Sequence, residues 1–552
     1  MKHEIQKFLE KAIKTLGYDI KEVDVDYPKN EVFGDYTTNV AMVLSKSVKK
    51  NPMTVAEEIV AVIASEVKQS QNSKIKLKKN EIATSPSAPR NDENIFEKIE
   101  IAKPGYINFY LSKEYLQNKI GEINKQKNKF GESKNGKGIK VNNEFISANP
   151  TGPLHLGNGR GGFLGDVIGK ILEKSGYDNV NEYYVNDAGE QVLKLGHSVA
   201  KDSEAVYAGD YIDELNKKFK GAEDIKKIGE KSGKIILDKI IKKTVKEKMQ
   251  INFDSWISEK KDLYDSGYVE KAIEKLKKKK LTYEKDGALW LETTKFGDDK
   301  DRVLVKKDGQ KTYFASDCGY ILNKIERKFE KIIEIWGADH HGYISRFKAA
   351  TEALGFKGEL KFVIVQLVRL VKDGKEARMS KRAGNIVYID ELISEVGLDA
   401  VRFFFLMYDA NTHMTFDLNL AKERSEKNPV YYIQYAYARI ANILAKSQKL
   451  KVKSQKSGNL SLLTHEKELN LIRELNKFPE LIESISKNYE VHRLPYYAIN
   501  LADKFHSFYN DCKVIDEENP ELTSARLNLI NAVKIVLGET LRILGVNAPD
   551  KM

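Results

Sequence analysis

The chain has 552 residues but only two cysteines, Cys318 and Cys512, and no Cys-x-x-Cys pair. Two isolated cysteines exclude a disulfide framework and give no sign of a cysteine-based zinc site. No run approaches about eighteen apolar residues, so a membrane-spanning helix is not expected. Residues 1–17 have the pattern of an amphipathic helix rather than that of a signal peptide. We therefore expect a protein of the reducing cytoplasm with no membrane partner.

Acidic residues are fewer than basic ones, with 80 Asp and Glu against 92 Lys and Arg, which gives a net charge of +12. This excess permits a polyanionic partner, because Lys and Arg release condensed counterions from phosphates. It does not identify one, since a charged fraction of 31% mostly forms a solvated surface. The length predicts several domains, about three or four.

Residues 1–125 are expected to form a small α/β domain. The apolar residues of the first helix recur on one face, and the strand-like stretch 99–111 is broken by Pro104-Gly105. Residues 65–94 differ sharply, because they are polar, lack aromatic residues and contain Ser-Pro-Ser-Ala-Pro at 85–89. Such a composition buries too little apolar surface to offset the entropy of ordering, so we predict a disordered insertion there.

Residues 126–410 alternate strand-like and helix-like segments, which is typical of a parallel sheet. The strand candidates are 180–185, 331–336 and 361–367. Residues 200–300 are rich in lysine and mainly helical in pattern, so they are interpreted as a connective insertion. The lysine run 277–280 within it is better explained as a solvated helix end than as an RNA contact.

Residues 411–552 are predicted to be a bundle of helices. Asn428-Pro429 and Asn519-Pro520 each provide a favourable N-cap and a proline in the first helical turn, and Gly545 ends the last helix. The predicted fold class is thus α/β: a Rossmann-type parallel-sheet domain, a small α/β N-terminal domain and a C-terminal all-helical bundle.

The first motif is Ala-Asn-Pro-Thr-Gly-Pro-Leu-His-Leu-Gly-Asn-Gly-Arg at 148–160. Its prolines and glycines predict a loop that leads into a helix over 163–174. His155 would then lie near a helix N-terminus, where free N–H groups and the helix dipole favour phosphate. Taken alone, such a histidine is more often a capping or surface residue.

The second motif is Arg-Met-Ser-Lys-Arg at 378–382. It predicts a loop with a hydroxyl group and several cations, which is suited to closing over a polyphosphate. By itself such a run is usually a solvated basic loop. The two motifs on one chain favour a nucleotide-activating enzyme.

In this order and spacing, the two motifs resemble the His-Ile-Gly-His and Lys-Met-Ser-Lys-Ser signatures of class I aminoacyl-tRNA synthetases. Further runs resemble the arginyl-tRNA synthetase family, and residues 336–341, Trp-Gly-Ala-Asp-His-His, resemble its adenosine-side loop. These further runs are 33–39, 184–189, 428–439 and 545–549. The resemblance covers the chain except residues 65–94.

The resemblance implies a ligase that converts ATP and L-arginine to arginyl-adenylate and then transfers arginine to the 3′ end of tRNA(Arg). It also implies Mg²⁺, an anticodon-binding role for residues 411–552, and a monomer with no metal ligand in the protein. Four sets of site residues follow. They are His155, Asn158, Ser380 and Lys381 for catalysis; Gly157, Gly159, Asp339, His340, His341, Arg378 and Met379 for ATP; Glu144, Asn149, Tyr313 and Asp317 for arginine; and Tyr36, Asn39, Tyr435 and Arg439 for tRNA.

Two positions depart from the family's signatures. Asn158 stands where the family often has a second histidine, so it can donate a hydrogen bond but carries no positive charge. Arg378 replaces the first lysine of the second signature and keeps the charge.

The expected chemistry accounts for these residue types. Attack of a carboxylate on the α-phosphate needs orientation and charge stabilisation more than acid–base catalysis. His155 would donate to phosphate oxygens, while Lys381 with Ser380, helped by Mg²⁺, would stabilise the leaving pyrophosphate. A guanidinium group has five donors in a fixed fork and needs carboxylate acceptors. Without the family, Tyr313 and Asp317 would be an ordinary i,i+4 surface pair.

Two alternatives remain open from the sequence. A small adenylyltransferase of the same fold would lack the helical residues 428–552. A catalytically silent, synthetase-like RNA-binding protein would bind RNA without pyrophosphate exchange, although it would have no need of His155, Ser380 and Lys381.

Overall fold

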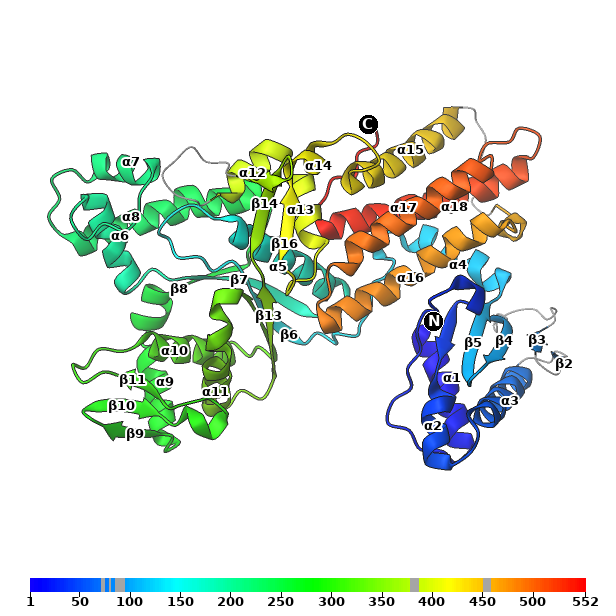
Figure 1. The fold of residues 1–552 in the computed structure, drawn as a ribbon, viewed down its shortest axis with the longest axis horizontal. Coiled ribbons are helices and arrows are strands. Elements are labelled where there is room, and N and C mark those ends of the chain that lie inside the picture. The colour runs from blue at the N-terminus through cyan, green and yellow to red at the C-terminus, as the bar shows by residue number, and fades with distance from the viewer. Residues whose placement is uncertain (71–74, 79–80, 85–94, 378–386, 450–457) are drawn as a thin grey trace.

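The protein, described here from a computed structural model, has three parts arranged around a central sheet (Figure 1). The structure describes residues 1–70, 75–78, 81–84, 95–377, 387–449 and 458–552. The second motif, 378–382, lies outside these residues. Among the described residues, no helix has both the length and the apolar character needed to cross a membrane.

The N-terminal part is an antiparallel sheet with helices packed beside it. The sheet order is β1-β5-β4-β3-β2. Its strands are β1 (Tyr36–Thr38), β2 (Ile75–Lys78), β3 (Glu81–Thr84), β4 (Phe96–Ala102) and β5 (Tyr106–Leu111). Its helices are α1 (Lys2–Thr15), η1 (Glu31–Phe33), α2 (Val40–Val48) and α3 (Pro52–Ser70). The predicted break at Pro104-Gly105 is the turn between β4 and β5.

The structure describes only part of the predicted insertion at 65–94, so the disorder proposed for the segment stays a prediction. Residues 65–70 continue α3, and β2 pairs with β3, which in turn pairs with β4. The alternation of apolar residues, for example Ile75 and Leu77, was too short for a strand to be recognised within this polar segment of the sequence. The described strands are joined to the rest of the sheet through the pairing of β3 with β4.

The central part confirms the predicted Rossmann-type parallel sheet. All neighbours in the order β13-β12-β6-β7-β8 are parallel. The strands are β6 (Lys140–Glu144), β7 (Asp178–Val185), β8 (Ser255–Ser258), β12 (Lys331–Gly337) and β13 (Glu359–Val365). Helix α5 (Leu156–Lys174) packs directly on this sheet. The closeness of the contact is shown at Gly165, where an added Cβ would meet Cγ of Phe145, the residue after β6, at 2.2 Å.

The predicted insertion at 200–300 is not one continuous excursion, because the chain returns to the main sheet at β8. Before β8 it forms helices, and after β8 it forms a small antiparallel sheet with flanking helices at the lower left of Figure 1. The first group is α6 (Glu190–Ala200), α7 (Asp210–Lys218), α8 (Ile225–Ile236), η3 (Leu237–Ile241) and η4 (Thr244–Lys248). The second is η5 (Glu259–Tyr264), α9 (Tyr268–Lys278), β9 (Thr282–Lys285), β10 (Ala288–Leu291), η6 (Thr293–Phe296), β11 (Arg302–Val305) and α10 (Tyr313–Glu326).

The chain then passes from β12 through η7 and α11 to β13 and on to a second small sheet, β15-β14-β16. These elements are η7 (Ala338–Tyr343), α11 (Ile344–Leu354), β14 (Val368–Lys372), β15 (Lys375–Glu376), α12 (Ile389–Val396), α13 (Leu398–Leu406), β16 (Met414–Asp417) and α14 (Leu418–Lys422).

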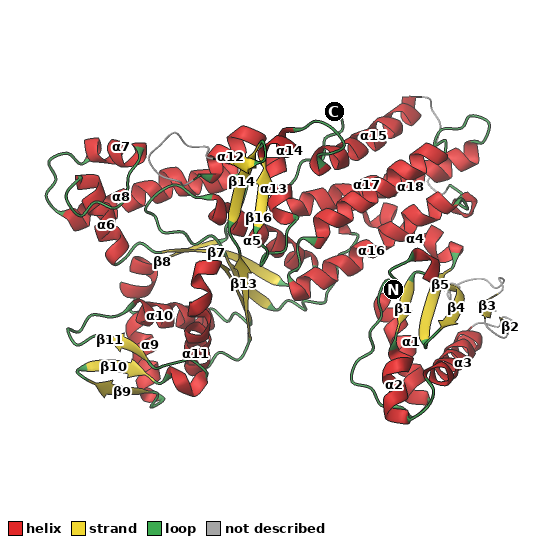
Figure 2. Cartoon of the chain, viewed as in Figure 1, coloured by secondary structure: helices red, strands yellow, loops and turns green. Residues whose placement is uncertain are grey.

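The C-terminal part is helical, as predicted, and Figure 2 shows it as a set of long helices beside the central sheet. Its elements are α15 (Pro429–Lys449), η8 (Leu460–Leu462), α16 (Glu466–Asn488), α17 (Arg493–Asp511) and α18 (Pro520–Leu544). Two connecting elements, α4 (Lys113–Gln126) and η2 (Lys127–Lys129), follow the N-terminal domain. The α4 residue Asn124 donates to the Asn528 carbonyl of α18 at 3.1 Å, so α4 packs with the bundle.

Arg402, a fully buried residue of α13, joins the central part to the bundle. Its guanidinium donates to the Asp166 carboxylate of α5, to the Met249 carbonyl at 2.7 Å and to the Leu544 carbonyl of α18 at 3.0 Å. A buried charge is tolerated only when it is paired and hydrogen-bonded, and this arrangement meets both conditions.

Candidate functional site

The candidate site lies at the carboxyl ends of β6 and β12. These neighbouring parallel strands lead into connections on opposite sides, to β7 and to β13, and such a switch point is where open α/β sheets bind ligands. The chain leaves β6 through a strained turn in which Ile146 and Ser147 have φ of 65° and 40°. Hydroxyl groups hold this turn, because the Ala148 N–H donates to Tyr183 Oη at 3.1 Å and the Tyr184 N–H donates to Ser147 Oγ at 3.0 Å.

His155 is the N-cap of α5. Its Nδ1 accepts from the Gly157 N–H at 3.1 Å, and the Asn158 side-chain carbonyl accepts from the His155 N–H at 3.1 Å. His155 is thus a capping residue, which was one of the two interpretations of the sequence. Its capping bond uses Nδ1, so Nε2 of the exposed ring remains available for another partner. Desolvation by the surrounding chain lowers the pKa of His155, and the negative charge of Asp339 opposes this shift.

The glycines of the first motif lie inside α5, because the helix begins at Leu156 and not after the motif as predicted. A Cβ on Gly157 would come within 3.0 Å of the His155 ring. A Cβ on Gly159 would meet Ile389 of α12 at 2.5 Å, so this face of Gly159 packs on protein. Contact of either glycine with adenine remains a prediction.

Glu144, the last residue of β6, belongs to a buried ionic network. The fully buried Lys324 donates to Glu144 Oε2 and to Glu334 Oε1, each at 2.6 Å. Burial raises the pKa of Glu334, and the neighbouring charge of Glu144 adds to this shift. The second oxygen of Glu144 accepts from Ser147 Oγ at 2.9 Å, so the strained turn and the network together fix this carboxylate.

Asp317 of α10 adds a second carboxylate, and its partner is Tyr343 of η7, which donates a hydroxyl hydrogen bond to it. Burial raises the pKa of Asp317 to about 7; the Tyr343 bond opposes this shift, and the charges of Glu259 and Glu144 add to it. Tyr313 is 48% exposed, and its hydroxyl accepts from the Glu190 N–H at 3.2 Å. The interpretation of Tyr313 and Asp317 as a surface pair is therefore not supported.

Glu259 is a third carboxylate of this cluster, and it was not among the residues predicted from the sequence. It follows the short strand β8, is 2% exposed and accepts from Ser316 Oγ at 2.5 Å. The Asn186 side-chain NH₂ donates to Glu259 Oε2 at 2.8 Å when the amide is oriented so that its oxygen and its nitrogen both have suitable partners. Burial raises the pKa of Glu259. Its position directly after β8 is the one signal that would have pointed to it.

Of the described residues predicted for ATP, Asp339 is close enough to His155 to act on its pKa. Asp339, His340 and His341 form the exposed segment η7 directly after β12, and His340 Nε2 lies 3.5 Å from Asp339 Oδ2. On the other side, the Leu156 N–H donates to the Val387 carbonyl at 3.3 Å, so the chain that follows the second motif lies beside the first. Asn149 is exposed in the loop that joins β6 to α5. Four of the predicted site residues lie outside the described residues: Arg378, Met379, Ser380 and Lys381.

The four residues predicted for tRNA separate into two groups. Tyr36 is 1% exposed and donates to Glu480 Oε1 of α16 at 3.0 Å, so its assignment as an RNA contact is wrong and it docks the N-terminal domain on the bundle. Asn39 is exposed at the start of α2. Tyr435 and Arg439 are one helical turn apart on α15, and the Arg439 guanidinium donates to Tyr435 Oη at 2.6 Å.

Tyr435 and Arg439 line a cavity of about 270 Å³ together with Tyr509 and Met552. The Arg439 guanidinium carbon lies 4.5 Å from the ring centre of Tyr435 and 5.1 Å from that of Tyr509. Both rings are more than one-third exposed. Exposed aromatic faces beside an arginine are the arrangement on which unpaired bases stack.

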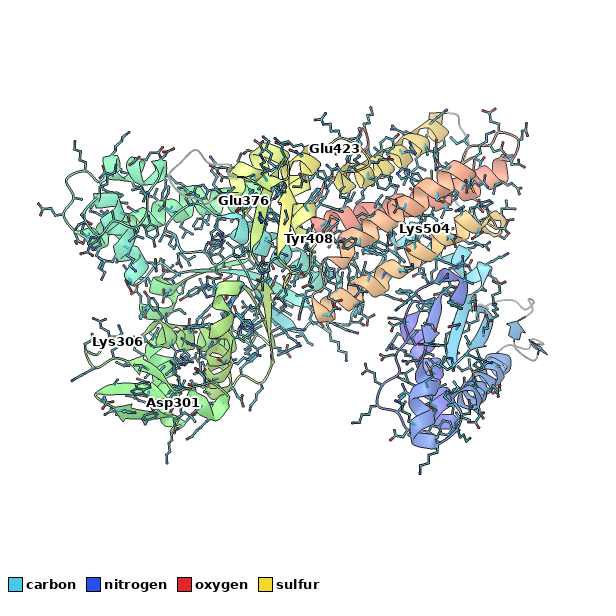
Figure 3. All side chains as sticks on the ribbon, viewed as in Figure 1. Asp301, Lys306, Glu376, Tyr408, Glu423 and Lys504 are labelled. Atoms are coloured by element: carbon cyan, nitrogen blue, oxygen red, sulfur yellow. The ribbon has the colours of Figure 1, made fainter. Side chains whose placement is uncertain are left out.

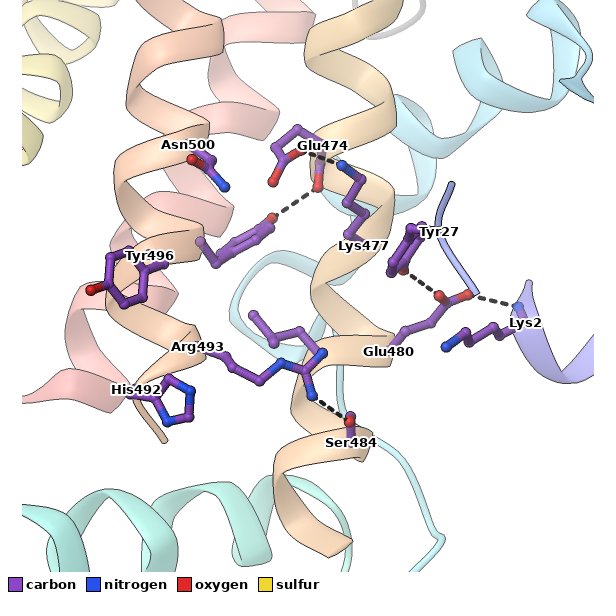
Figure 4. A pocket seen from close by; sticks show the side chains of 12 residues that line it. Lys2, Tyr27, Glu474, Lys477, Glu480, Ser484, His492, Arg493, Tyr496 and Asn500 are labelled. Carbon is purple, nitrogen blue, oxygen red and sulfur yellow. Dashed lines mark hydrogen bonds and ion pairs between the residues drawn. The ribbon is translucent and has the colours of Figure 1, made fainter. Parts of the chain in front are cut away.

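A further cavity, of about 520 Å³, lies between α1, α16 and α17 and is shown in Figure 4. Its cations are paired with acidic or polar groups, for example Lys477 with Glu474 at 2.7 Å and Arg493 with Ser484 at 2.7 Å. It contains none of the motif residues, so we assign the active site to the carboxylates at the sheet edge rather than to this cavity. Within the described residues, no group of three or more His, Cys, Asp or Glu side chains is placed to hold a metal ion.

Comparisons with known proteins agree with this geometry. Residues 1–73 and 64–111 match the arginyl tRNA synthetase N terminal domain, residues 197–425 the catalytic domain of class I (R) tRNA synthetases, and residues 433–552 the DALR anticodon binding domain.

Full-length relatives extend these matches over the whole chain. The arginine–tRNA ligase of Bacillus subtilis is 42% identical over 575 residues, which cover 100% of this chain and 98% of the relative. That of Listeria welshimeri is 40% identical over 576 residues, with coverage of 99% and 98%. The solved arginyl-tRNA synthetase of Thermus thermophilus, at 20% identity, superposes with a TM-score of 0.78 over 100% of both chains and so shows the same fold. The resemblance and the fold class are confirmed, and the chain belongs to the arginyl-tRNA synthetases of class I.

Proposed function

We propose that this chain is an arginine–tRNA ligase: it activates L-arginine with ATP to arginyl-adenylate and transfers arginine to the 3′ end of tRNA(Arg), releasing pyrophosphate and AMP. The observation that carries the proposal is the cluster of Glu144, Asp317 and Glu259 at the switch point of the sheet. Because these buried carboxylates repel one another, a cation bound between them is favoured. In a chain of this family, the guanidinium group of the substrate arginine would be that cation.

The cluster fits a guanidinium group better than an ammonium group. Its acceptors come from three directions, Glu144 from β6, Glu259 from η5 and Asp317 from α10. A planar group with five donors can bond to several carboxylates at once, whereas an ammonium group is a compact point charge. Tyr313 would close the open side of the pocket, and Asn149 would contact the arginine backbone.

ATP would lie along the N-terminus of α5 between η7 and residues 378–382. The helix N-terminus offers free N–H groups, and His155 Nε2 can donate to phosphate oxygens. Ser380 and Lys381 would stabilise the leaving pyrophosphate. Asn158 is committed through its carbonyl to capping, so only its NH₂ can face the ligand.

Mg²⁺ is expected to enter with ATP. Mg²⁺ is usually held by one or two carboxylates and by substrate phosphates rather than by a cage of protein ligands. Asp339, an exposed carboxylate close enough to His155 to act on its pKa, fits such an arrangement. Bound there, Mg²⁺ would neutralise phosphate charge.

Transfer RNA would contact both ends of the molecule. The net charge of +12 favours a polyanion, and the cavity at Tyr435 and Arg439 is suited to stacked anticodon bases. Exposed Asn39 is the remaining candidate on the N-terminal domain. We further propose that the protein acts as a monomer in the cytoplasm, where its substrates are found.

Charging of total tRNA with each of the twenty amino acids, in the presence of ATP and Mg²⁺, tests the proposal. Arginine alone should be attached, and charging of another amino acid would overturn it. Exchange of pyrophosphate into ATP should depend on arginine and on added tRNA, as the family resemblance implies. A protein that binds tRNA but shows no exchange under any condition would instead be the silent RNA-binding alternative. The adenylyltransferase alternative does not account for residues 433–552.

A further inference from the structure

Tyr343 connects two segments that the proposed function uses separately. It is the last residue of η7, the segment that carries Asp339, His340 and His341 on the proposed ATP side. Its hydroxyl nevertheless donates to Asp317, a carboxylate on the proposed arginine side. A single side chain therefore joins the two half-sites by a direct hydrogen bond.

The ring of Tyr343 is held so that its hydroxyl cannot easily turn away. The Arg346 guanidinium carbon lies 4.5 Å from the ring centre, and the indole of Trp336 packs edge-on with ring centres 6.3 Å apart. Trp336 itself belongs to β12, so the orientation of the ring depends on the main sheet. The hydroxyl is thus fixed by packing on both sides.

Two of the three carboxylates of the cluster receive their donors from the same helix, α10. Glu144 is held by Lys324 of α10 and Glu259 by Ser316 of α10. Asp317 differs, because its donor, Tyr343, comes from η7, the segment that follows β12 and carries the residues proposed for ATP. ATP contacts on η7 would therefore act directly on the segment that holds the hydroxyl orienting Asp317.

We propose that Tyr343 is a positioning residue that couples arginine binding to ATP binding. Its hydroxyl holds the Asp317 carboxylate in the orientation that receives the guanidinium, and ATP contacts on η7 hold the hydroxyl in place. Coupling between two sites is reciprocal, so each substrate should strengthen the binding of the other. This inference rests on the proposed function and specifies how its two substrate sites communicate.

The test is Tyr343→Phe, which keeps the ring and removes only the hydroxyl. Hydrogen bonds to charged groups are strong enough that the arginine KM should rise about tenfold or more, with kcat within about threefold of wild type. In the unmodified enzyme saturating ATP should lower the arginine KM, and in the variant this effect should disappear. The readout is pyrophosphate exchange with tRNA present, at low and at saturating ATP.

A matched control is Tyr283→Phe, because the Tyr283 hydroxyl donates to Asp301 at 3.0 Å in the small antiparallel sheet, where Asp301 is labelled in Figure 3. This control should leave both Michaelis constants unchanged. In an Asp317→Asn background, removal of the Tyr343 hydroxyl should have little further effect, because both changes act through the same carboxylate.

Three outcomes are distinguishable. If the unmodified enzyme charges no arginine, the proposed function fails. If it charges arginine and Tyr343→Phe has the same arginine KM and the same response to ATP, only the coupling by Tyr343 is refuted. If the variant loses thermal stability but keeps both kinetic quantities, Tyr343 has a purely structural role and the proposal is again refuted.

Discussion

Replacing Asp317 with asparagine should make the free protein more stable while it weakens arginine binding. Burial raises the Asp317 pKa from an ordinary 3.8 to about 7, so between about pH 4 and pH 7 the folded state holds a proton that the unfolded state has lost. Stability therefore falls as pH rises from about 4 to 7. A difference of about three units corresponds to about 4 kcal/mol, an upper limit for the gain from Asp317→Asn at pH 8. The asparagine oxygen can still accept from Tyr343.

The effect on arginine should have the opposite sign. Removing one carboxylate from a desolvated guanidinium costs about 2–5 kcal/mol, so the arginine KM should rise about 30-fold or more. In the unmodified enzyme the arginine KM should fall about tenfold between pH 6 and pH 8 as Asp317 ionises. The variant should lose that component of the pH profile.

Thermal melting at pH 5 and pH 8 and pyrophosphate exchange over the same range measure both effects. The ATP KM serves as the internal control and should hardly change. Citrulline, which has the shape of arginine without its charge, should compete better on the variant than on the unmodified enzyme. A variant that charges arginine normally, with an unaltered pH profile, would show that Asp317 does not face the substrate.

Four other perturbations give distinct results. Lys324→Gln leaves Glu144 and Glu334 buried without a cation, so it should destabilise the fold by about 3–5 kcal/mol in denaturant unfolding, and an unchanged midpoint would argue against the network. Arg439→Ala should raise the KM for tRNA about tenfold in aminoacylation without altering the arginine KM, unless the cavity on α15 binds no base. Lys381→Ala should reduce the activation rate about a hundredfold or more in single-turnover experiments; a raised ATP KM with normal turnover would instead mean ground-state binding. Deleting residues 65–94 should lower the melting temperature, because β3 pairs with β4, and an unaltered melting curve would mean that this pairing adds nothing.

The parts of the fold that were predictable from the sequence are those with long periodic segments and strong end signals. The strands β7 and β12 and the helices that start at Pro429 and Pro520 lie where the patterns put them. The start of α5 was missed because glycines and prolines normally indicate a loop, whereas a His155 cap and close packing on Ile389 keep Gly159 in the helix.

The candidate site was less accessible to sequence reasoning, because burial depends on distant elements. Tyr36 lies in a run that resembles the family, but nothing local shows that its hydroxyl meets Glu480, 444 residues later. Glu259 follows a four-residue strand that pairs only at the edge of the sheet, so neither its burial nor its nearness to Asp317 could be read from neighbouring residues.

The buried guanidinium of Arg402 limits how far this enzyme can be treated as a set of modules. Its three partners belong to helix α5 of the candidate site, to the end of the segment before β8 and to the last turn of α18. A catalytic fragment that ends before α18 would keep the charge but lose one of its acceptors and the cover that keeps water out. Grafting a foreign anticodon-binding bundle onto this catalytic domain would therefore require a backbone carbonyl at the position of Leu544, and not only a compatible linker.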